Sequence, residues 1–207
     1  MHDMNKKIWD SYAPIYELAM RADRKVYQYM YERIPQIIAD KEVLEIATGP
    51  GMLAKNVADT AKNMIATDYS DGMIAEAKKG NYPANLTFEA ADATALPYEA
   101  DSFDVVLIAN ALHVMPKPEK ALSEIDRVLK SDGILIATNF VAHKGTFIGR
   151  VWSKILQIAG ISFEHQWSAA GYQDFLKQNG WEIRHSREMQ ARFSIVYTEC
   201  VRDESRR

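Results

Sequence analysis

An acid within an apolar run, followed by two glycines, is the most chemically suggestive stretch of this chain. The segment VLEIATGPG, residues 43–51, reads as a strand that contains Glu45 and ends in a loop with Gly49 and Gly51. Glycine allows a positive φ and a close approach of the backbone to another group. A strand, a glycine turn and a helix form the usual place where an α/β protein receives a nucleotide-like ligand. The stretch therefore predicts a nucleotide-type binding site.

The elements around this loop alternate between apolar strands and amphipathic helices. Strands are expected at residues 43–47, 63–67, 86–90, 103–110 and 133–139. Helices are expected at 52–62, 71–79 (capped by Ser70) and 117–130, with a turn at 131–133. This alternation predicts a Rossmann-like, doubly wound α/β fold with helices on both faces of a mostly parallel sheet. A helix at 167–180 and strands at 181–188 and 192–201 would add an antiparallel edge, giving about seven strands.

We expect a single domain, residues 1–207, with additions at two places. Residues 1–40 are predicted to form an N-terminal helical cap, because two helical patterns precede the first strand. Residues 140–166 interrupt the alternation with an apolar helical stretch and are predicted to form a lid-like insertion. A chain of 207 residues, 47% of them hydrophobic, is long enough to bury a sizeable core.

Composition excludes several classes of function. The net charge of −3 gives no global basic field for nucleic acid, and a single cysteine excludes an intramolecular disulfide. The sequence has no group of Cys, His and carboxylates with the spacing of metal ligands, and we expect no metal. It has no continuous apolar run of the length of a signal peptide or a membrane span, so we expect a cytoplasmic protein.

The glycine loop is compatible with two kinds of ligand. Residues 49–54, GPGMLA, match the dinucleotide pattern G-x-G-x-x-G/A, a short pattern that also recurs by chance. Pro50 removes a backbone N–H where a pyrophosphate would want a donor. Two further residues, Ala47 and Thr48, separate the strand from the first glycine, and the chain leaves little room for a substrate domain. These features favour a ligand without phosphate.

These residues resemble the class I S-adenosylmethionine (SAM)-dependent methyltransferases. EIATGPG is similar to their first motif, acid-x-Gly-x-Gly-x-Gly, with Ala47 at the first glycine. A Cβ is tolerable there if φ is negative, so we expect cofactor binding to survive. The later motifs follow in order as IATDYSDGMI, EAADATALPY, DSFDVVLIANALHVM and LKSDGILIATNF. The resemblance covers residues 40–140 in detail and extends loosely to the N-terminal WDSYAPIYE.

The resemblance implies SAM as cofactor and S-adenosylhomocysteine (SAH) as product. It implies that Glu45 lies near the cofactor's amino group and that Asp68 accepts both ribose hydroxyls. The other implied cofactor-binding residues are Ala47, Thr48, Gly49 and Gly51 against the methionine part, and Tyr69, Met73, Asp92 and Ala93 around the adenine.

Each of these residues also has a structural interpretation. Glu45 could be a satisfied core carboxylate, Asp68 a helix cap and Asp92 a turn residue. If the glycines serve the cofactor, alanine at Gly49 or Gly51 should weaken SAM binding far more than folding.

The residues that handle the methyl acceptor are harder to identify, because an in-line displacement needs alignment of a nucleophile more than a catalytic motif. Asn110 and His113 follow the fourth expected strand, beside the methyl group. His113 could be a general base or a packed histidine at a helix start. Tyr12 and Tyr16 resemble N-terminal tyrosines that cover the site in related enzymes, or they pack into the core from a helix. His143 and His165 bracket the inserted apolar stretch and could line an acceptor pocket or lie on the surface. The residues that suggest an apolar lid, or else complete the core, are Phe147, Trp152, Ile155 and Trp167.

The NALHVM stretch with an apolar lid resembles methyltransferases of quinone biosynthesis and soluble phospholipid N-methyltransferases. The leading interpretation is methyl transfer to a small, apolar molecule, by a monomer or homodimer. A second interpretation adds contact with a membrane surface, although acids nearly cancel the basic residues of the N-terminal segment. An NAD-dependent oxidoreductase and a non-catalytic SAM-fold binding protein would also fit the pattern of elements. Nucleic-acid methylation is disfavoured, because Asn110-Ala-Leu-His lacks the Asn-Pro-Pro-aromatic motif of base amino methylation.

Overall fold

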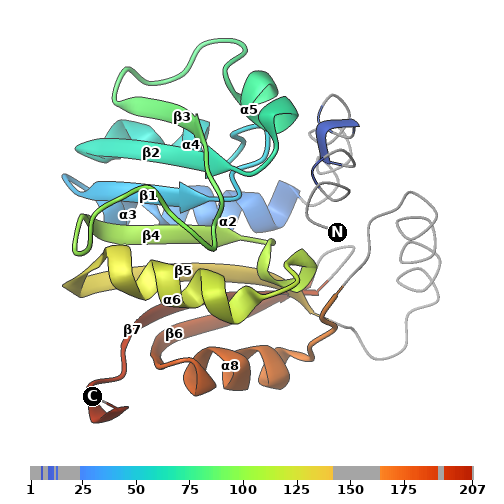
Figure 1. Ribbon diagram of the computed structural model, residues 1–207, viewed down its shortest axis with the longest axis vertical. Coiled ribbons are helices and arrows are strands. Elements are labelled where there is room, and N and C mark those ends of the chain that lie inside the picture. Colours follow the sequence, from blue (N-terminus) through green and yellow to red (C-terminus); the bar gives the residue numbers. More distant parts are fainter. Residues whose placement is uncertain are drawn as a thin grey trace.

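One sheet of seven strands, in the order β3-β2-β1-β4-β5-β7-β6, organises the described part of the chain (Figure 1). The computed structural model describes Lys6, residues 9–11, Ala13 and residues 24–141, 164–190 and 194–206. The strands are β1 (Glu42–Ile46), β2 (Asn63–Asp68), β3 (Leu86–Ala90), β4 (Phe103–Ala109), β5 (Leu129–Val141), β6 (Trp181–Gln190) and β7 (Ser194–Arg202). This architecture confirms the predicted doubly wound α/β fold.

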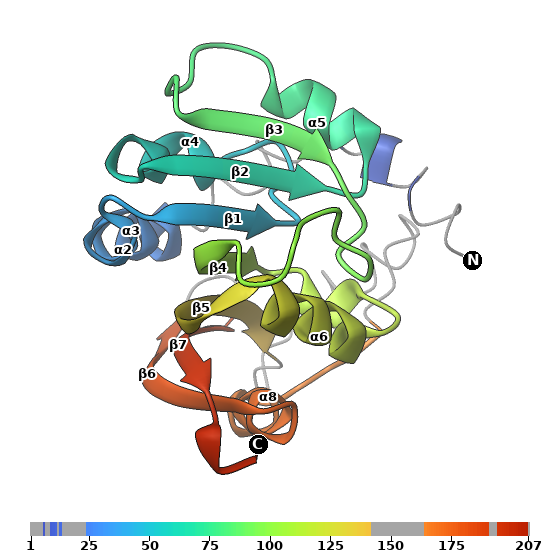
Figure 2. The same cartoon turned by 60° about the vertical axis from the view of Figure 1, so that its left-hand side comes forward.

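Strand direction follows the expected pattern. Strands β1 to β5 pair in parallel, and β7 runs antiparallel to both β5 and the edge strand β6. Figure 2 shows the arrowheads of β1, β2 and β3 pointing to the same edge of the sheet. The predicted ligand-binding residues at the carboxyl ends of these strands therefore share that edge.

The helices are α2 (Arg24–Arg33), α3 (Pro35–Ile38), α4 (Ala54–Val57), α5 (Asp71–Ala77), α6 (Pro118–Val128) and α8 (Ala169–Gln178), with 3-10 turns η2 (Ala58–Thr60), η3 (Leu112–Val114) and η4 (Glu204–Arg206). Helices α6 and α8 lie on one face of the sheet and α2, α3 and α4 on the other (Figure 1). As expected, Ser70 caps α5, because its hydroxyl accepts a hydrogen bond from the N–H of Met73.

Each face of the sheet has its own hydrophobic cluster. One cluster joins α2, α3, α4 and α5 to the sheet, with Met30, Ile34 and Phe88 buried within it. The other joins α6 and α8 to the sheet through Leu122 and Leu176. Because β1 is covered on both faces, it reads as a nearly continuous apolar run. Glu45 is the one acid among the buried residues of β1, Val43–Ile46, which makes its burial informative.

Two predicted elements differ from the structure. The helix expected over 52–62 is shorter in the structure, since the turn after β1 extends to Leu53 and only α4 and the following 3-10 turn η2 are helical. The turn expected at 131–133 lies inside β5, where the pairing with β4 steps from Phe103–Leu129 to Val105–Ile134. The three extra residues of β5 thus form an irregularity of the strand rather than a separate turn.

The division into cap and lid stays a prediction. Helices α2 and α3 pack on the sheet within the expected cap, and most of the expected lid, residues 142–163, lies outside the described residues. No helix among the described residues is long and apolar enough to cross a membrane. Cys200 is fully buried in β7, where desolvation raises the pKa of its thiol to about 12.

Candidate active site

The loop that leaves β1 reverses direction within five residues. The N–H of Thr48 donates to the carbonyl of Thr67 at 2.8 Å, and the N–H of Gly51 donates to the carbonyl of Thr48 at 3.1 Å. Gly49 and Gly51 have φ values of +57° and +79°. The two glycines are therefore required by the left-handed backbone of this turn, as the sequence suggested.

Ala47 also has a left-handed backbone, with φ of +57°. The condition under which a Cβ is tolerated without strain, a negative φ, is therefore not met at this position. The chain must turn sharply where β1 ends for the N–H of Thr48 to remain paired with Thr67. This conformation costs an L-residue with a Cβ about 1–2 kcal/mol, so the loop carries local strain.

Ala47→Gly is expected to stabilise the protein by about 0.5–1 kcal/mol, because the relief of strain exceeds the added chain entropy of glycine. Urea unfolding measures this change in the free energy of unfolding. Ala95→Gly is the matched control, since Ala95 is exposed and is not among the residues with positive φ. The control should lose stability by a few tenths of a kcal/mol or more, and a loss of similar size in both variants would contradict strain at Ala47.

Gly51 has a left-handed backbone and is also closely packed against the hydrophobic core. A Cβ at this position would lie 2.7 Å from Cζ and 2.8 Å from Cε1 of Phe88, which is buried under the loop. The expectation that alanine here affects binding far more than folding therefore needs correction. Gly51 contributes to stability through close packing in addition to any contact with a ligand.

Asp68, at the end of β2, connects two loops. Its Oδ2 accepts a hydrogen bond from the N–H of Gly49 at 2.8 Å, and its Oδ1 accepts one from the N–H of Ser70 at 2.9 Å. Burial raises the pKa of the Asp68 carboxyl, and these backbone N–H groups offset part of that effect. Each carboxylate oxygen has about two acceptor positions, so further donors such as hydroxyls can still be accepted.

Glu45 is a buried carboxyl beneath the glycine loop, with 1% of its surface exposed. The hydroxyl of Thr48 donates to its Oε2 at 3.0 Å. Desolvation raises the pKa of Glu45 to about 8, and the negative charge of Asp68 adds to this rise. Glu45 is therefore mostly protonated at pH 7, and a cation beside it would favour its charged form.

The residues expected around an adenine lie beside Asp68. The N–H of Ala91 donates to the carbonyl of Asp68, which brings the loop with Asp92 and Ala93 next to the end of β2. Oδ1 of Asp92 accepts from both the N–H and the hydroxyl of Thr94 at 2.8 Å, so Asp92 does form a turn. Tyr69 is half-buried and Met73 is buried. Their contacts with adenine stay predictions.

Asn110, after β4, is a buried amide that finds no hydrogen-bond partner within the described part of the chain. Its side chain is 8% exposed, and neither amide atom meets a partner among the described residues. Its backbone is left-handed, with φ of +54°, and its N–H donates to the carbonyl of Thr138 at 2.8 Å. An amide that is buried and unpartnered is costly, so this side chain is suited to a ligand that supplies the missing hydrogen bonds.

His113 is buried at the start of η3. Its Nδ1 lies 3.0 Å from Oδ1 of Asn139, a residue that sequence reasoning missed. Since Oδ1 of an amide accepts, Nδ1 carries the proton. Burial lowers the pKa of His113 to about 4, helped by the nearby His165, whose N–H donates to the carbonyl of His113. His113 is thus neutral at pH 7 and a weak base.

The low pKa of His113 contributes unfavourably to folding in acid. Folding lowers the pKa of His113 from 6.5 to about 4, so the unfolded chain binds more protons between these values and stability falls as pH falls through that window. The loss at pH 4 is up to roughly 3 kcal/mol. Glu45 contributes in the opposite sense over this window, because its pKa is raised to about 8, so the difference between the two proteins is the informative quantity. As pH falls from 7 to 4, His113→Gln should gain stability relative to the wild type by up to roughly 3 kcal/mol in urea unfolding. A constant difference between the two proteins would contradict a buried neutral histidine.

Several predicted residues cannot be placed. Tyr12, Tyr16 and His143 lie outside the described residues, as do Phe147, Trp152 and Ile155. Trp167 is described, and its ring stacks on His165 with centroids 5.0 Å apart. Asp10 was given no role in binding by the sequence analysis. It lies against the first residues of α5, where it accepts hydrogen bonds from Ser70 and Gly72. The only signal for it was its place in the WDSYAPIYE segment.

The polar side chains at the carboxyl ends of the parallel strands favour a cationic or neutral ligand. Glu45 and Asp68 interact electrostatically, and burial raises the pKa of both. A pyrophosphate would add negative charge to this pair, whereas an ammonium and ribose hydroxyls would supply the cation and the donors that it lacks. The unpartnered amide of Asn110 adds both donors and an acceptor. Glu45, Asp68 and Asn110 thus fit a nucleoside with an amino-acid chain better than a dinucleotide.

Comparison with known proteins agrees with this geometry. A family model described as a methyltransferase domain matches residues 44–137. A demethylmenaquinone methyltransferase from Renibacterium salmoninarum is 33% identical over 138 residues, 64% of this chain and 57% of that protein. A ubiquinone/menaquinone biosynthesis C-methyltransferase from Allorhizobium ampelinum is 34% identical over 113 residues, 51% of this chain and 44% of that protein. The chain spans about half the length of these curated relatives.

Solved structures show the same fold at low sequence identity. A structure described as a DhpI–SAH complex aligns with a TM-score of 0.77 at 18% identity, over 99% of this chain and 98% of that one. A chain from a complex of the Haloferax volcanii Trm112 methyltransferase activator with a methyltransferase aligns with a TM-score of 0.76 at 20% identity. That alignment covers 95% of this chain and 96% of the other.

Proposed function

We propose that this chain, whose residues 44–137 match a model of a methyltransferase domain, is a class I SAM-dependent methyltransferase that transfers a methyl group from SAM to a small, apolar molecule. The observation that carries the proposal is the buried carboxyl of Glu45 together with the half-buried carboxyl of Asp68, which accepts a hydrogen bond from Gly49 in the glycine loop. This pair complements a ligand with both an ammonium and ribose hydroxyls.

The residues present fit SAM at each of its polar groups. Glu45 would face the ammonium, Asp68 the ribose hydroxyls and Asp92 the adenine amino group, while the amide of Asn110 would supply hydrogen bonds to the methionine part. When bound, SAM supplies an electrophilic methyl group on a sulfonium. The chain's own task is to hold the acceptor atom in line with that methyl and to exclude water.

The neutral state of His113 supports an acceptor that needs no strong base. With a pKa of about 4, His113 can accept a proton only weakly. A soft or readily ionised nucleophile, such as a thiol or the ring carbon of an electron-rich phenol, is compatible with this site. The names of the curated relatives favour a quinone-type acceptor as the second, narrower candidate. Such an acceptor would bring the protein to a membrane surface.

Calorimetric titration with SAM, SAH and NAD, followed by transfer of labelled methyl to a panel of phenols, hydroquinones, thiols and amines, tests the proposal. We expect SAM and SAH to bind, NAD not to bind, and at least one acceptor to be methylated. NAD binding alone would support an oxidoreductase instead. Binding of SAM without transfer to any acceptor class would support a non-catalytic binding protein.

Cofactor binding is expected to release protons. At pH 7 a carboxyl with a pKa of about 8 is roughly 90% protonated, and an ammonium placed beside it should drive it to ionise. SAH titrations at pH 7 in buffers of different ionisation enthalpy should therefore show release of nearly one proton per site. In Glu45→Gln the release should vanish. Equal release in both proteins would show that the ammonium does not face Glu45.

A further inference from the structure

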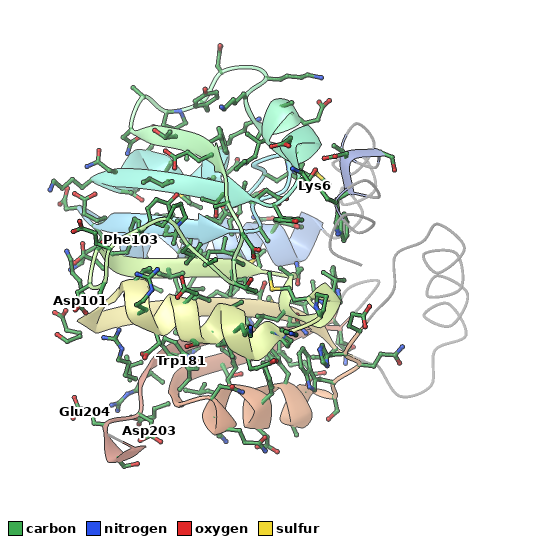
Figure 3. The ribbon with its side chains drawn as sticks, viewed as in Figure 1. Lys6, Asp101, Phe103, Trp181, Asp203 and Glu204 are labelled. Carbon is green, nitrogen blue, oxygen red and sulfur yellow. The ribbon has the colours of Figure 1, made fainter. Side chains whose placement is uncertain are left out.

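The N-terminal segment contacts the start of α5, directly beside the proposed cofactor site. Oδ1 of Asp10 accepts a hydrogen bond from the hydroxyl of Ser70 at 2.5 Å and one from the N–H of Gly72 at 2.9 Å. Lys6 forms an ion pair with Asp71 at 2.6 Å, and Figure 3 shows Lys6 beside α5. Residues about 60 positions apart in the chain are thereby joined at one point.

The two partners approach each other closely. A Cβ at Gly72 would lie 2.9 Å from the backbone Cα of Asp10, so only glycine at this position leaves room for the segment. Ala13, three residues after Asp10, is buried with 3% of its surface exposed. The hydrogen bond from Ser70 is the largest cause that lowers the pKa of Asp10, so the residue is charged at neutral pH. The contact is therefore a packed and charged one rather than a chance surface approach.

Ser70 links this contact to the acid expected to hold the ribose. Its N–H donates to Oδ1 of Asp68 at 2.9 Å, while its hydroxyl donates to Asp10 and accepts from the N–H of Met73. Ser70 is 1% exposed, so this arrangement is protected from water. Asp68 in turn accepts from Gly49 in the glycine loop. A continuous series of hydrogen bonds thus runs from the N-terminal segment to the cofactor loop.

We propose that Asp10 is a positioning residue of the cofactor site, which fixes the loop between β2 and α5 through Ser70 so that docking of the N-terminal segment and binding of the nucleoside stabilise each other. This inference rests on the proposed function, because it takes Asp68 as the ribose acceptor. Thermodynamic linkage makes the effect reciprocal: if the docked segment tightens cofactor binding, the cofactor protects the docked segment by the same factor.

Four variants test the coupling by SAH calorimetry and by the rate of tryptic cleavage between residues 6 and 25, measured with and without saturating SAH. Asp10→Ala removes the acceptor. Asp10→Asn keeps an oxygen that can accept both hydrogen bonds and serves as the conservative rescue. Gly72→Ala displaces Asp10 through its Cβ while improving the helix propensity of α5. Asp71→Asn is the control, since it removes only the exposed ion pair with Lys6.

In the wild type, SAH should slow cleavage of the segment by about tenfold. Asp10→Ala and Gly72→Ala should weaken SAH binding by about tenfold and lose the protection, although Gly72→Ala should melt no lower than the wild type. Asp10→Asn and Asp71→Asn should remain within about threefold of the wild-type dissociation constant.

Unchanged SAH affinity in Asp10→Ala and Gly72→Ala would overturn the inference while leaving the proposed function intact. The same holds if the loss of affinity merely follows a loss of melting temperature in every variant. A wild type that binds no SAH would remove the proposed function and the coupling together.

Discussion

Asp68→Ala is expected to weaken SAH binding by at least about 100-fold. The variant removes the acceptor for two ribose hydroxyls, and hydrogen bonds to a charged group contribute roughly 1.5–3 kcal/mol each. It also releases the N–H groups of Gly49 and Ser70, which the carboxylate holds at 2.8 and 2.9 Å. Losses of about 3 kcal/mol or more correspond to this change in the dissociation constant. Isothermal titration with SAH measures it directly.

The same variant should change stability little. Burial raises the pKa of Asp68 above its value in the unfolded chain, so the folded state binds more protons and the ionised carboxylate opposes folding as pH rises past 4. Asp68→Ala removes this unfavourable free energy of ionisation in the folded state. The gain offsets the stability lost with the two hydrogen bonds from the backbone N–H groups. Asp59→Ala, at an exposed carboxylate on η2, is the matched control and should leave SAH affinity unchanged. A collapse of folding in Asp68→Ala would instead indicate a purely structural acid.

Gly51→Ala is expected to lower the free energy of unfolding by about 2–5 kcal/mol. The left-handed backbone at φ of +79° accounts for about 1–2 kcal/mol, and the clash of the new Cβ with the buried ring of Phe88 adds about 1–3 kcal/mol. SAH binding should weaken as well, because the loop must shift to accommodate the methyl group. Urea unfolding gives the stability change and calorimetry the affinity.

A variant at Gly180 separates the effect of backbone strain from the effect of the clash with Phe88. It has φ of +87°, yet a Cβ there would meet nothing within 4 Å, so Gly180→Ala carries the backbone strain alone and should lose about 1–2 kcal/mol. Adding Phe88→Leu to Gly51→Ala should recover part of the loss, since it shortens the side chain that clashes. Equal losses at Gly51 and Gly180 would show that Phe88 moves aside without cost.

The strands could be predicted because they depend on local apolar runs. Residues 86–90 form β3 as expected, and the cap at Ser70 follows from a side chain that bonds its own helix. Even Glu45 could be singled out, because an acid in a strand covered on both faces must be compensated. These features are encoded within a few residues of sequence.

The conformation of the loop and the contact at α5 could not be predicted in the same way. The φ of Ala47 depends on the pairing of Thr48 with Thr67 across two strands, and alanine carries no local signal for a left-handed backbone. The hydrogen bonds from Ser70 and Gly72 to Asp10 join segments brought together only by the finished fold. Likewise, Asn139 reaches His113 only because β4 and β5 are neighbours.

The single cysteine makes this chain convenient for spectroscopic labelling. Cys200 is fully buried in β7 and its thiol has a pKa of about 12, so it holds almost no reactive thiolate near neutral pH. A cysteine introduced at an exposed position, such as Tyr82→Cys near the start of β3, would therefore react alone with a maleimide dye. The native background needs no cysteine removal, and a second introduced cysteine, placed in the N-terminal segment, would let label-to-label distances follow the docking of that segment.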